Sequence, residues 1–108
     1  MDPRIKFALQ IMGDATAVEL TVAHVAHEIG LSPSRFEHIL KAATGRNFRQ
    51  HKRSVRMRHA KRLLQDWQLS LKQIAYLTGY SSASSFSRAF RNSVCRSPSQ
   101  HRMRISVR

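Results

Sequence analysis

The chain repeats one segment of its own sequence, and this repeat restricts the possible folds more than any other feature. Residues 20–32, LTVAHVAHEIGLS, align with residues 69–81, LSLKQIAYLTGYS, at an offset of 49. After the following turn the offset becomes 50, which pairs Phe36 with Phe86, so the second turn is one residue longer. Self-similarity of this kind indicates two copies of one supersecondary unit in a single chain.

Each copy has the pattern of two helices joined by a tight turn. Thr21 and Ser70 are expected N-caps, and apolar residues follow each of them at spacings of three and four. Gly30 and Gly79 stand at the turn, where the backbone needs a positive φ. Ser32 precedes a proline, a pattern typical of the start of the next helix. Two such copies predict an all-α fold with two helix-turn-helix units, in which the second helix of each unit enters the major groove of DNA.

Helical spacing divides the second helix of each unit into a buried face and an outward face. The expected buried faces are Phe36, Ile39, Leu40 and Ala43 in the first unit, and Phe86, Ala89, Phe90 and Ser93 in the second. The expected outward faces are Ser34, Glu37, His38 and Lys41 in the first unit, and Ser84, Ser87, Arg88 and Arg91 in the second. The outward faces match position for position at the offset of 50. We therefore expect the aromatic residues to be core and the outward residues to face DNA.

The segment between the units contains no glycine or proline and is predicted to form one long helix over 48–67. Met57, Ala60, Leu64 and Trp67 recur at helical spacing and are expected to pack against both units. Twenty helical residues span about 30 Å, and successive major-groove segments on one side of a duplex lie about 34–36 Å apart. This helix either holds both units over adjacent groove segments or is an ordinary core helix with a solvated basic face, and the two interpretations are compatible.

Short helices are expected at 4–12 and after Ser97-Pro98, which brings the total to about seven helices. We expect a single domain over 1–108. Its predicted parts are a first helix-turn-helix subdomain at 4–47, the linker helix at 48–67 and a second helix-turn-helix subdomain at 68–104.

Positive charge is concentrated after residue 37. The 108 residues carry 19 Lys and Arg against 6 Asp and Glu, a net charge of +13, yet Asp66 is the single acidic residue in 38–108. This imbalance indicates a polyanionic partner, with nucleic acid favoured over an anionic membrane surface. No apolar run approaches the roughly 18 residues of a membrane span. No expected helix pairs a basic face with a broad, free apolar one, so no membrane partner is expected. The single Cys95 excludes an internal disulfide framework and fits a reducing cytoplasm.

Four motifs follow one another in the second half of the chain. They are RMRHAKRLL (56–64), IAYLTGY (74–80), FSRAF (86–90) and SP (97–98). In this order they resemble the AraC/XylS family of transcription regulators. The segment LSPSRFEHILKAATG (31–45) is similar to the first recognition helix of that family and its K-x-x-T-G end, so the resemblance covers about 20–104.

The resemblance implies two helix-turn-helix subdomains joined by a long helix, and a bacterial, cytoplasmic, nucleoid-associated regulator that binds asymmetric DNA sites. The family's base-contacting positions correspond to Ser34, Glu37, His38, Ser84, Ser85, Ser87 and Arg88. The expected phosphate contacts are Lys41, Arg46, Arg49, Arg53, Ser82 and Arg91. The chain departs from the family pattern at Cys95, where glycine or a small polar residue is usual, at His101, where an aromatic residue is common, and at His51-Lys52.

Two other functions stay open on the sequence alone. The chain could be a non-specific nucleic-acid binder, although it lacks a set of exposed aromatic residues for stacking on bases. It could also be an adaptor whose basic face docks on RNA polymerase or an acidic protein. His24 and His27 are three residues apart but have no third metal ligand near in sequence. We expect no catalytic residue, no metal and no cofactor, and a monomer whose partners are double-stranded DNA and RNA polymerase.

Overall fold

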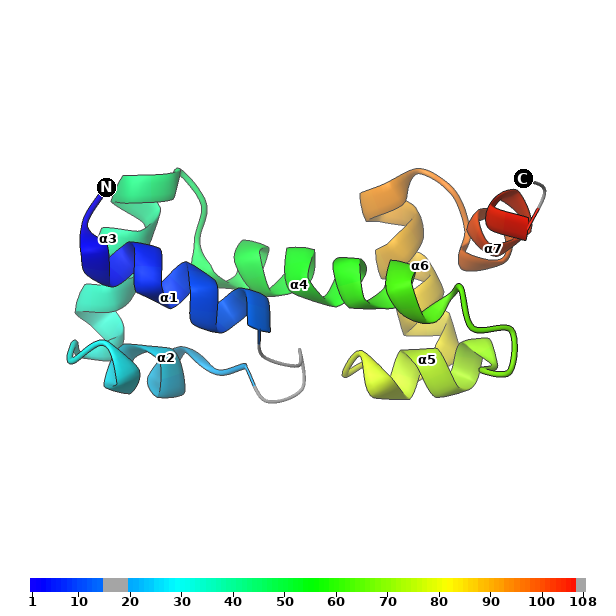
Figure 1. Cartoon of the computed structure of the whole chain (residues 1–108), viewed down its shortest axis with the longest axis horizontal. Coiled ribbons are helices and arrows are strands. Elements are labelled where there is room, and N and C mark those ends of the chain that lie inside the picture. The colour runs from blue at the N-terminus through cyan, green and yellow to red at the C-terminus, as the bar shows by residue number, and fades with distance from the viewer. Residues whose placement is uncertain (15–19, 107–108) are drawn as a thin grey trace. The chain divides into compact units, whose positions relative to one another are not determined.

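The computed structural model of the protein describes residues 1–14 and 20–106, and within these residues it contains helices and no strand (Figure 1). The seven helices are α1 (Pro3–Asp14), α2 (Val22–Glu28), α3 (Pro33–Thr44), α4 (Phe48–Leu63), α5 (Leu71–Leu77), α6 (Ala83–Val94) and α7 (Pro98–Ser106). The all-α prediction, with two helix-turn-helix units and a long central helix, is confirmed.

The chain divides into two compact units, Met1–Val55 and Arg56–Arg108, so α4 contributes its first half to one unit and its second half to the other. Each unit has its own core. The core of the first unit is Ile5, Ala8, Met12, Leu20, Val25, Ala26, Ile29, Phe36, Leu40, Phe48 and Val55. The core of the second unit is Met57, Ala60, Leu64, Ile74, Ala75, Phe86 and Phe90.

The two units are built in the same way. An entry helix comes first: α1 buries Ile5, Ala8 and Met12. In the second unit, Met57 and Ala60 of α4 and Leu64, directly after the helix, are buried at the same spacing of three and then four. The helix-turn-helix pair follows, α2 with α3 in one unit and α5 with α6 in the other. A closing helix then packs on the pair. In the first unit this is the start of α4, whose Phe48 meets Phe36 edge to face with ring centroids 6.0 Å apart. In the second unit it is α7, whose His101 meets Phe90 in the same way at 5.5 Å.

Local capping explains where the helices begin. The Thr21 hydroxyl accepts from the His24 amide at 3.1 Å, and the Ser70 hydroxyl accepts from the Gln73 amide at 3.1 Å. The Oε1 of Gln73 accepts in return from the Ser70 amide at 2.8 Å, which completes a capping box. These bonds satisfy amides that have no partner within the first turn of a helix. The N-caps predicted at Thr21 and Ser70 are therefore confirmed.

The turns inside both units use glycine as predicted. Gly30 has a φ of 73° and Gly79 a φ of 89°, the left-handed region that glycine adopts without a steric penalty. The next residue of each unit donates its amide back into the first helix, Leu31 to the Ala26 carbonyl and Tyr80 to the Ala75 carbonyl, both at 2.9 Å. The chain is thereby redirected into the second helix of the pair.

The central helix is shorter than predicted. It ends at Leu63 and not at residue 67, because the chain tightens into a turn in which Asp66 donates its amide to the Leu63 carbonyl at 3.0 Å. The guanidinium of Arg102 fixes this turn by donating to the carbonyls of Leu64 at 3.0 Å and Asp66 at 3.1 Å. Trp67 consequently lies outside the core. Its side chain is 55% exposed, and its ring faces the Arg102 guanidinium at 5.1 Å, so the prediction that Trp67 packs against both units was wrong.

The inner faces of α3 and α6 also differ from the prediction in their last turns. Phe36 and Leu40, and Phe86 and Phe90, are fully buried as expected, and Ile39 and Ala89 are partly buried. Ala43 and Ser93, however, are exposed. The buried side of each helix continues in steps of four residues to Thr44 in α3 and Val94 in α6, both half-buried. Thr44 therefore takes the place predicted for Ala43, and Val94 the place predicted for Ser93.

Candidate nucleic-acid interface

The first candidate surface is the outer face of α3. The Ser32 hydroxyl caps this helix by accepting from the Arg35 amide at 3.2 Å, and Pro33 occupies its first turn. Phe36 and Leu40 anchor the opposite face in the core. The four residues predicted to face outward, Ser34, Glu37, His38 and Lys41, are all exposed.

A shallow hollow of about 470 Å³ lies on this outer face. Glu37, His38, Lys41, Ala42 and Asn47 line it. A carboxylate, an imidazole and an ammonium group thus meet within one small surface. Such a surface can both donate and accept hydrogen bonds, as reading base edges requires, whereas a purely basic surface could only donate.

The second candidate surface is the outer face of α6. Phe86 and Phe90 hold the inner face, while Ser84, Arg88 and Arg91 are exposed and Ser87 is half-buried. Ser84 and Ser85, one turn before Arg88 on the helix, carry only short hydroxyl side chains. Arg88 is one of two cations in the helix, the other being Arg91 one turn later.

Ser82 and Ser85 are engaged at the start of α6. The Ser82 hydroxyl caps the helix by accepting from the Ser85 amide at 3.0 Å, and it donates to the Ser85 hydroxyl at 3.1 Å. Ser85 is half-buried, unlike Ser84. The structure therefore distinguishes Ser84 and Ser87 from Ser82 and Ser85, a difference that helical spacing could not predict because it arises from the cap.

Of the cations predicted to bind phosphate, Lys41, Arg49, Arg53 and Arg91 are exposed. Arg46 is also exposed, but its guanidinium donates to the Gln50 carbonyl at 3.2 Å and to the Ser54 hydroxyl at 2.6 Å. Arg46 is therefore held against α4 in a fixed orientation. The first turn of α4 is capped reciprocally by Asn47 and Gln50, with both bonds at 2.9 Å.

Three histidines are held toward the neutral state. Burial lowers the pKa of His51 below its usual value, and the positive charge of Arg46 lowers it further. The Nε2 of His51 lies 2.9 Å from the hydroxyl of Thr44, the last residue of α3. Burial is also the main cause of the lowered pKa of His59 and of His101, each of which has cationic neighbours as well.

Sequence analysis missed two basic residues that shape the second unit. The Arg56 guanidinium lies 4.9 Å from the centre of the Tyr80 ring, at the turn between α5 and α6. Arg102 is buried and ties α7 to the turn after α4. Sequence alone does not separate these two residues from exposed arginines, whereas their three-dimensional contacts do.

The described part of the chain contains no cluster of three or more His, Cys, Asp and Glu side chains arranged to hold a metal ion. In the same residues, no helix combines the length and the apolar character needed to cross a membrane.

Comparison with known proteins gives consistent matches. Residues 25–104 match the family described as the helix-turn-helix domain. The HTH-type transcriptional regulator GlxA of Rhizobium meliloti is 35% identical over 102 residues, which cover 94% of this chain and 32% of that protein. The chain thus spans about a third of the length of this relative.

Two solved structures match over nearly their whole length. A transcriptional regulator from Chromobacterium violaceum, described as AraC-type DNA-binding domain-containing, superposes with a TM-score of 0.85 at 27% identity and covers 94% of this chain and 90% of its own. A DNA-binding transcriptional dual regulator from Escherichia coli superposes with a TM-score of 0.86 at 27% identity and covers 100% of this chain and 96% of its own.

Proposed function

This chain belongs to the AraC/XylS family of helix-turn-helix transcription regulators, and we propose that it regulates transcription by binding duplex DNA at specific sequences. The observation that carries the proposal is the duplicated outer face. Two helices of 12 residues, α3 and α6, each bury a pair of large apolar side chains and carry a matched set of polar ones on the opposite face, all exposed except the half-buried Ser87. This arrangement supports a DNA-binding role.

We propose that α3 and α6 enter adjacent segments of the major groove of one duplex. Ser34, Glu37 and His38 would contact bases from the first helix, and Ser84, Ser87 and Arg88 from the second. The Ser85 hydroxyl, which accepts from the Ser82 hydroxyl, would contact a base with its remaining hydrogen-bonding capacity. Arginine pairs with the O6 and N7 of guanine, and a carboxylate accepts from the N4 of cytosine. Arg88 is therefore the best candidate for reading guanine, and Glu37 for reading cytosine.

The exposed cations supply the sequence-independent part of the affinity. These cations are Lys41 on α3, Arg46 just after it, Arg49 and Arg53 on α4, and Arg91 on α6, and all are exposed. Ser82 is the N-cap of α6. Contacts of this kind with phosphate release counterions, so binding should weaken steeply as salt concentration rises. We propose that the protein acts as a monomer on DNA in the bacterial cytoplasm, with RNA polymerase as a second partner.

Selection of bound sequences from a pool of random duplexes tests this function directly. Sequencing of the bound fraction should return one asymmetric site with two conserved segments about one helical turn apart. At fixed salt, the selected site should be bound at least about 10³-fold more tightly than random duplex. Equal affinity for the selected and the random duplexes would indicate a non-specific nucleic-acid binder instead.

A further inference from the structure

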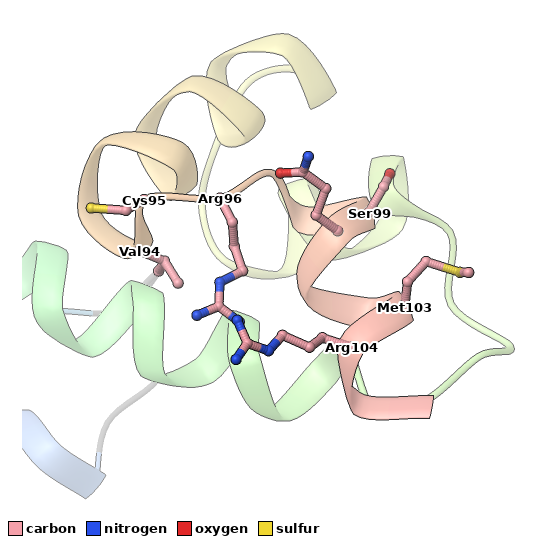
Figure 2. A pocket seen from close by; sticks show the side chains of 7 residues that line it. Val94, Cys95, Arg96, Ser99, Met103 and Arg104 are labelled. Atoms are coloured by element: carbon pink, nitrogen blue, oxygen red, sulfur yellow. The ribbon is translucent and has the colours of Figure 1, made fainter. Parts of the chain in front are cut away.

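An open hollow of about 710 Å³ lies at the junction of α6 and α7 in the second unit (Figure 2). Val94 and Met103 give it an apolar lining, and the exposed thiol of Cys95 lies at its edge. Arg96 and Arg104 also line it, and Figure 2 shows their side chains extending toward one another across the space between the two helices. The hollow therefore combines an apolar surface with two guanidinium groups.

Positive charge in this hollow has no acidic counterpart. Arg96, Arg104 and Lys61 all lie near enough to His101 to help lower its pKa, after the larger effect of burial. Within the described residues, the ion pair that the structure contains is Arg4 with Asp2, in the other unit. An arrangement of several cations without a carboxylate attracts an anion, and guanidinium groups bind carboxylates with charge-assisted hydrogen bonds.

The first unit has an equivalent arginine between α3 and α4, but its guanidinium is hydrogen-bonded within the unit. Arg46, Gln50 and Ser54 correspond to Arg96, Gln100 and Arg104 at the offset of 50. Arg46 donates to the Gln50 carbonyl and the Ser54 hydroxyl. In the second unit an arginine replaces that serine, so Arg96 meets another cation where Arg46 meets an acceptor. The replacement leaves both guanidinium groups available to an external ligand.

The hollow lies away from the residues proposed to read bases. Val94 comes six residues after Arg88 and ten after Ser84, which corresponds to about 9 Å and about 15 Å along the axis of α6. DNA that contacts the first half of α6 therefore leaves this end of the helix accessible. The apolar lining also favours a protein ligand, because a phosphate backbone offers no apolar group to bury there.

We propose that this hollow is a docking site for an acidic segment of a partner protein. Carboxylates of the segment bind Arg96 and Arg104, and an apolar side chain of the segment packs against Val94 and Met103. The proposal does not depend on α6 reading bases.

A synthetic acidic peptide tests the site. The probe is a 14-residue amphipathic peptide, blocked at both ends, with glutamates and leucines at helical spacing and a fluorophore for anisotropy titration. Its binding should slow the reaction of Cys95 with a neutral disulfide reagent, since Cys95 is the single cysteine of the chain. The double variant R96Q/R104Q should bind the peptide at least about tenfold more weakly than the unmodified protein.

The matched control is R58Q/R62Q, which removes the same charge from two exposed positions of α4. It should keep the peptide affinity within about threefold. Peptides with glutamine for glutamate, or serine for leucine, should bind more weakly than the parent peptide. Circular dichroism and thermal unfolding of both variants establish that they are folded.

Three results would overturn the proposal. The first is absence of peptide binding to the unmodified protein, and the second is an equal loss of affinity in the two double variants. The third is protection of Cys95 by a random DNA duplex that displaces the peptide, with R96Q/R104Q losing more duplex affinity than R58Q/R62Q. That third result would identify the hollow as a phosphate-binding site for DNA.

Discussion

Gly45 and Cys95 occupy equivalent positions, at the ends of α3 and α6. Both are C-caps in the left-handed region, with φ of 75° at Gly45 and 64° at Cys95. Each donates its amide four residues back, to the Lys41 carbonyl at 2.8 Å and the Arg91 carbonyl at 2.9 Å. Glycine adopts this conformation freely, whereas a residue with a Cβ is strained there. Cys95 is the one non-glycine residue with positive φ in the described part of the chain.

We therefore expect Cys95→Gly to stabilise the protein. Removing the left-handed strain gains about 1–2 kcal/mol, and the greater freedom of glycine in the unfolded chain offsets about 0.4–1 kcal/mol of this. Urea denaturation should give a net gain of about 0.5–1 kcal/mol in the free energy of unfolding. Gly45→Ala is the reverse experiment, because a Cβ at Gly45 meets no atom within 4 Å and strain alone should lower the stability. A loss of stability in Cys95→Gly would show that the thiol makes a packing contribution larger than the strain.

Arg88 carries the second residue-scale prediction, which rests on the proposed function. Arg88→Ala should weaken binding to the selected site by about 1–3 kcal/mol and relax the preference at one base pair. Arg91→Ala, one turn later on the same exposed face, should lower affinity for all sequences equally and reduce the salt slope by about one. Electrophoretic mobility shifts on the selected site and on its single-base variants measure both effects. If Arg88→Ala weakens all duplexes equally, Arg88 contacts phosphate and not a base.

At the scale of the elements, helix starts could be predicted from the sequence and one helix end could not. Thr21, Ser32 and Ser70 cap helices through bonds to residues three positions later, so their signal is entirely local. The end of α4 is set by Arg102, which bonds to carbonyls 36 and 38 residues earlier in the chain. The candidate surfaces follow the same division. Helical spacing predicts the outward faces of α3 and α6, but it does not show that Arg46, just before α4, bonds the Ser54 hydroxyl within that helix.

Substitution of Arg102 tests how much its hydrogen bonds between α7 and the turn after α4 stabilise the fold. Arg102→Met keeps much of the side-chain length but leaves the Leu64 and Asp66 carbonyls without their donor, and an unsatisfied buried acceptor costs about 1–3 kcal/mol. The free energy of unfolding should fall by about this amount. Arg102→Lys should recover part of the loss, because lysine keeps the charge but cannot bond both carbonyls with a planar fork. Stability unchanged in Arg102→Met would mean that other contacts hold α7 in place.

At the scale of the whole molecule, the positive net charge and the protonation of histidines both act to destabilise the folded state at low pH. Residues 1–55 contain eight basic and five acidic side chains, whereas residues 56–108 contain eleven basic side chains and one acidic. Every histidine that gains a proton therefore adds charge to a chain that is already strongly positive, and self-repulsion of this kind destabilises a compact state. His59 and His101 lie in the more basic unit, and arginines are among the groups that lower the pKa of each.

We expect the protein to lose stability as the pH falls below about 6.5. Burial first, and cationic neighbours second, lower the pKa of His51, His59 and His101 below the 6.5 of an unperturbed histidine. The unfolded chain then binds protons at a higher pH than the folded one, so the stability from these groups is complete above pH 6.5 and is lost as the pH falls through the folded-state values. Thermal unfolding from pH 8 to pH 5 should show this decline. The variant H51Q/H59Q/H101F, in which the glutamine at position 51 can still bond the Thr44 hydroxyl, should flatten the profile between pH 7 and pH 5. A profile as steep as that of the unmodified protein would place the pH dependence in other groups.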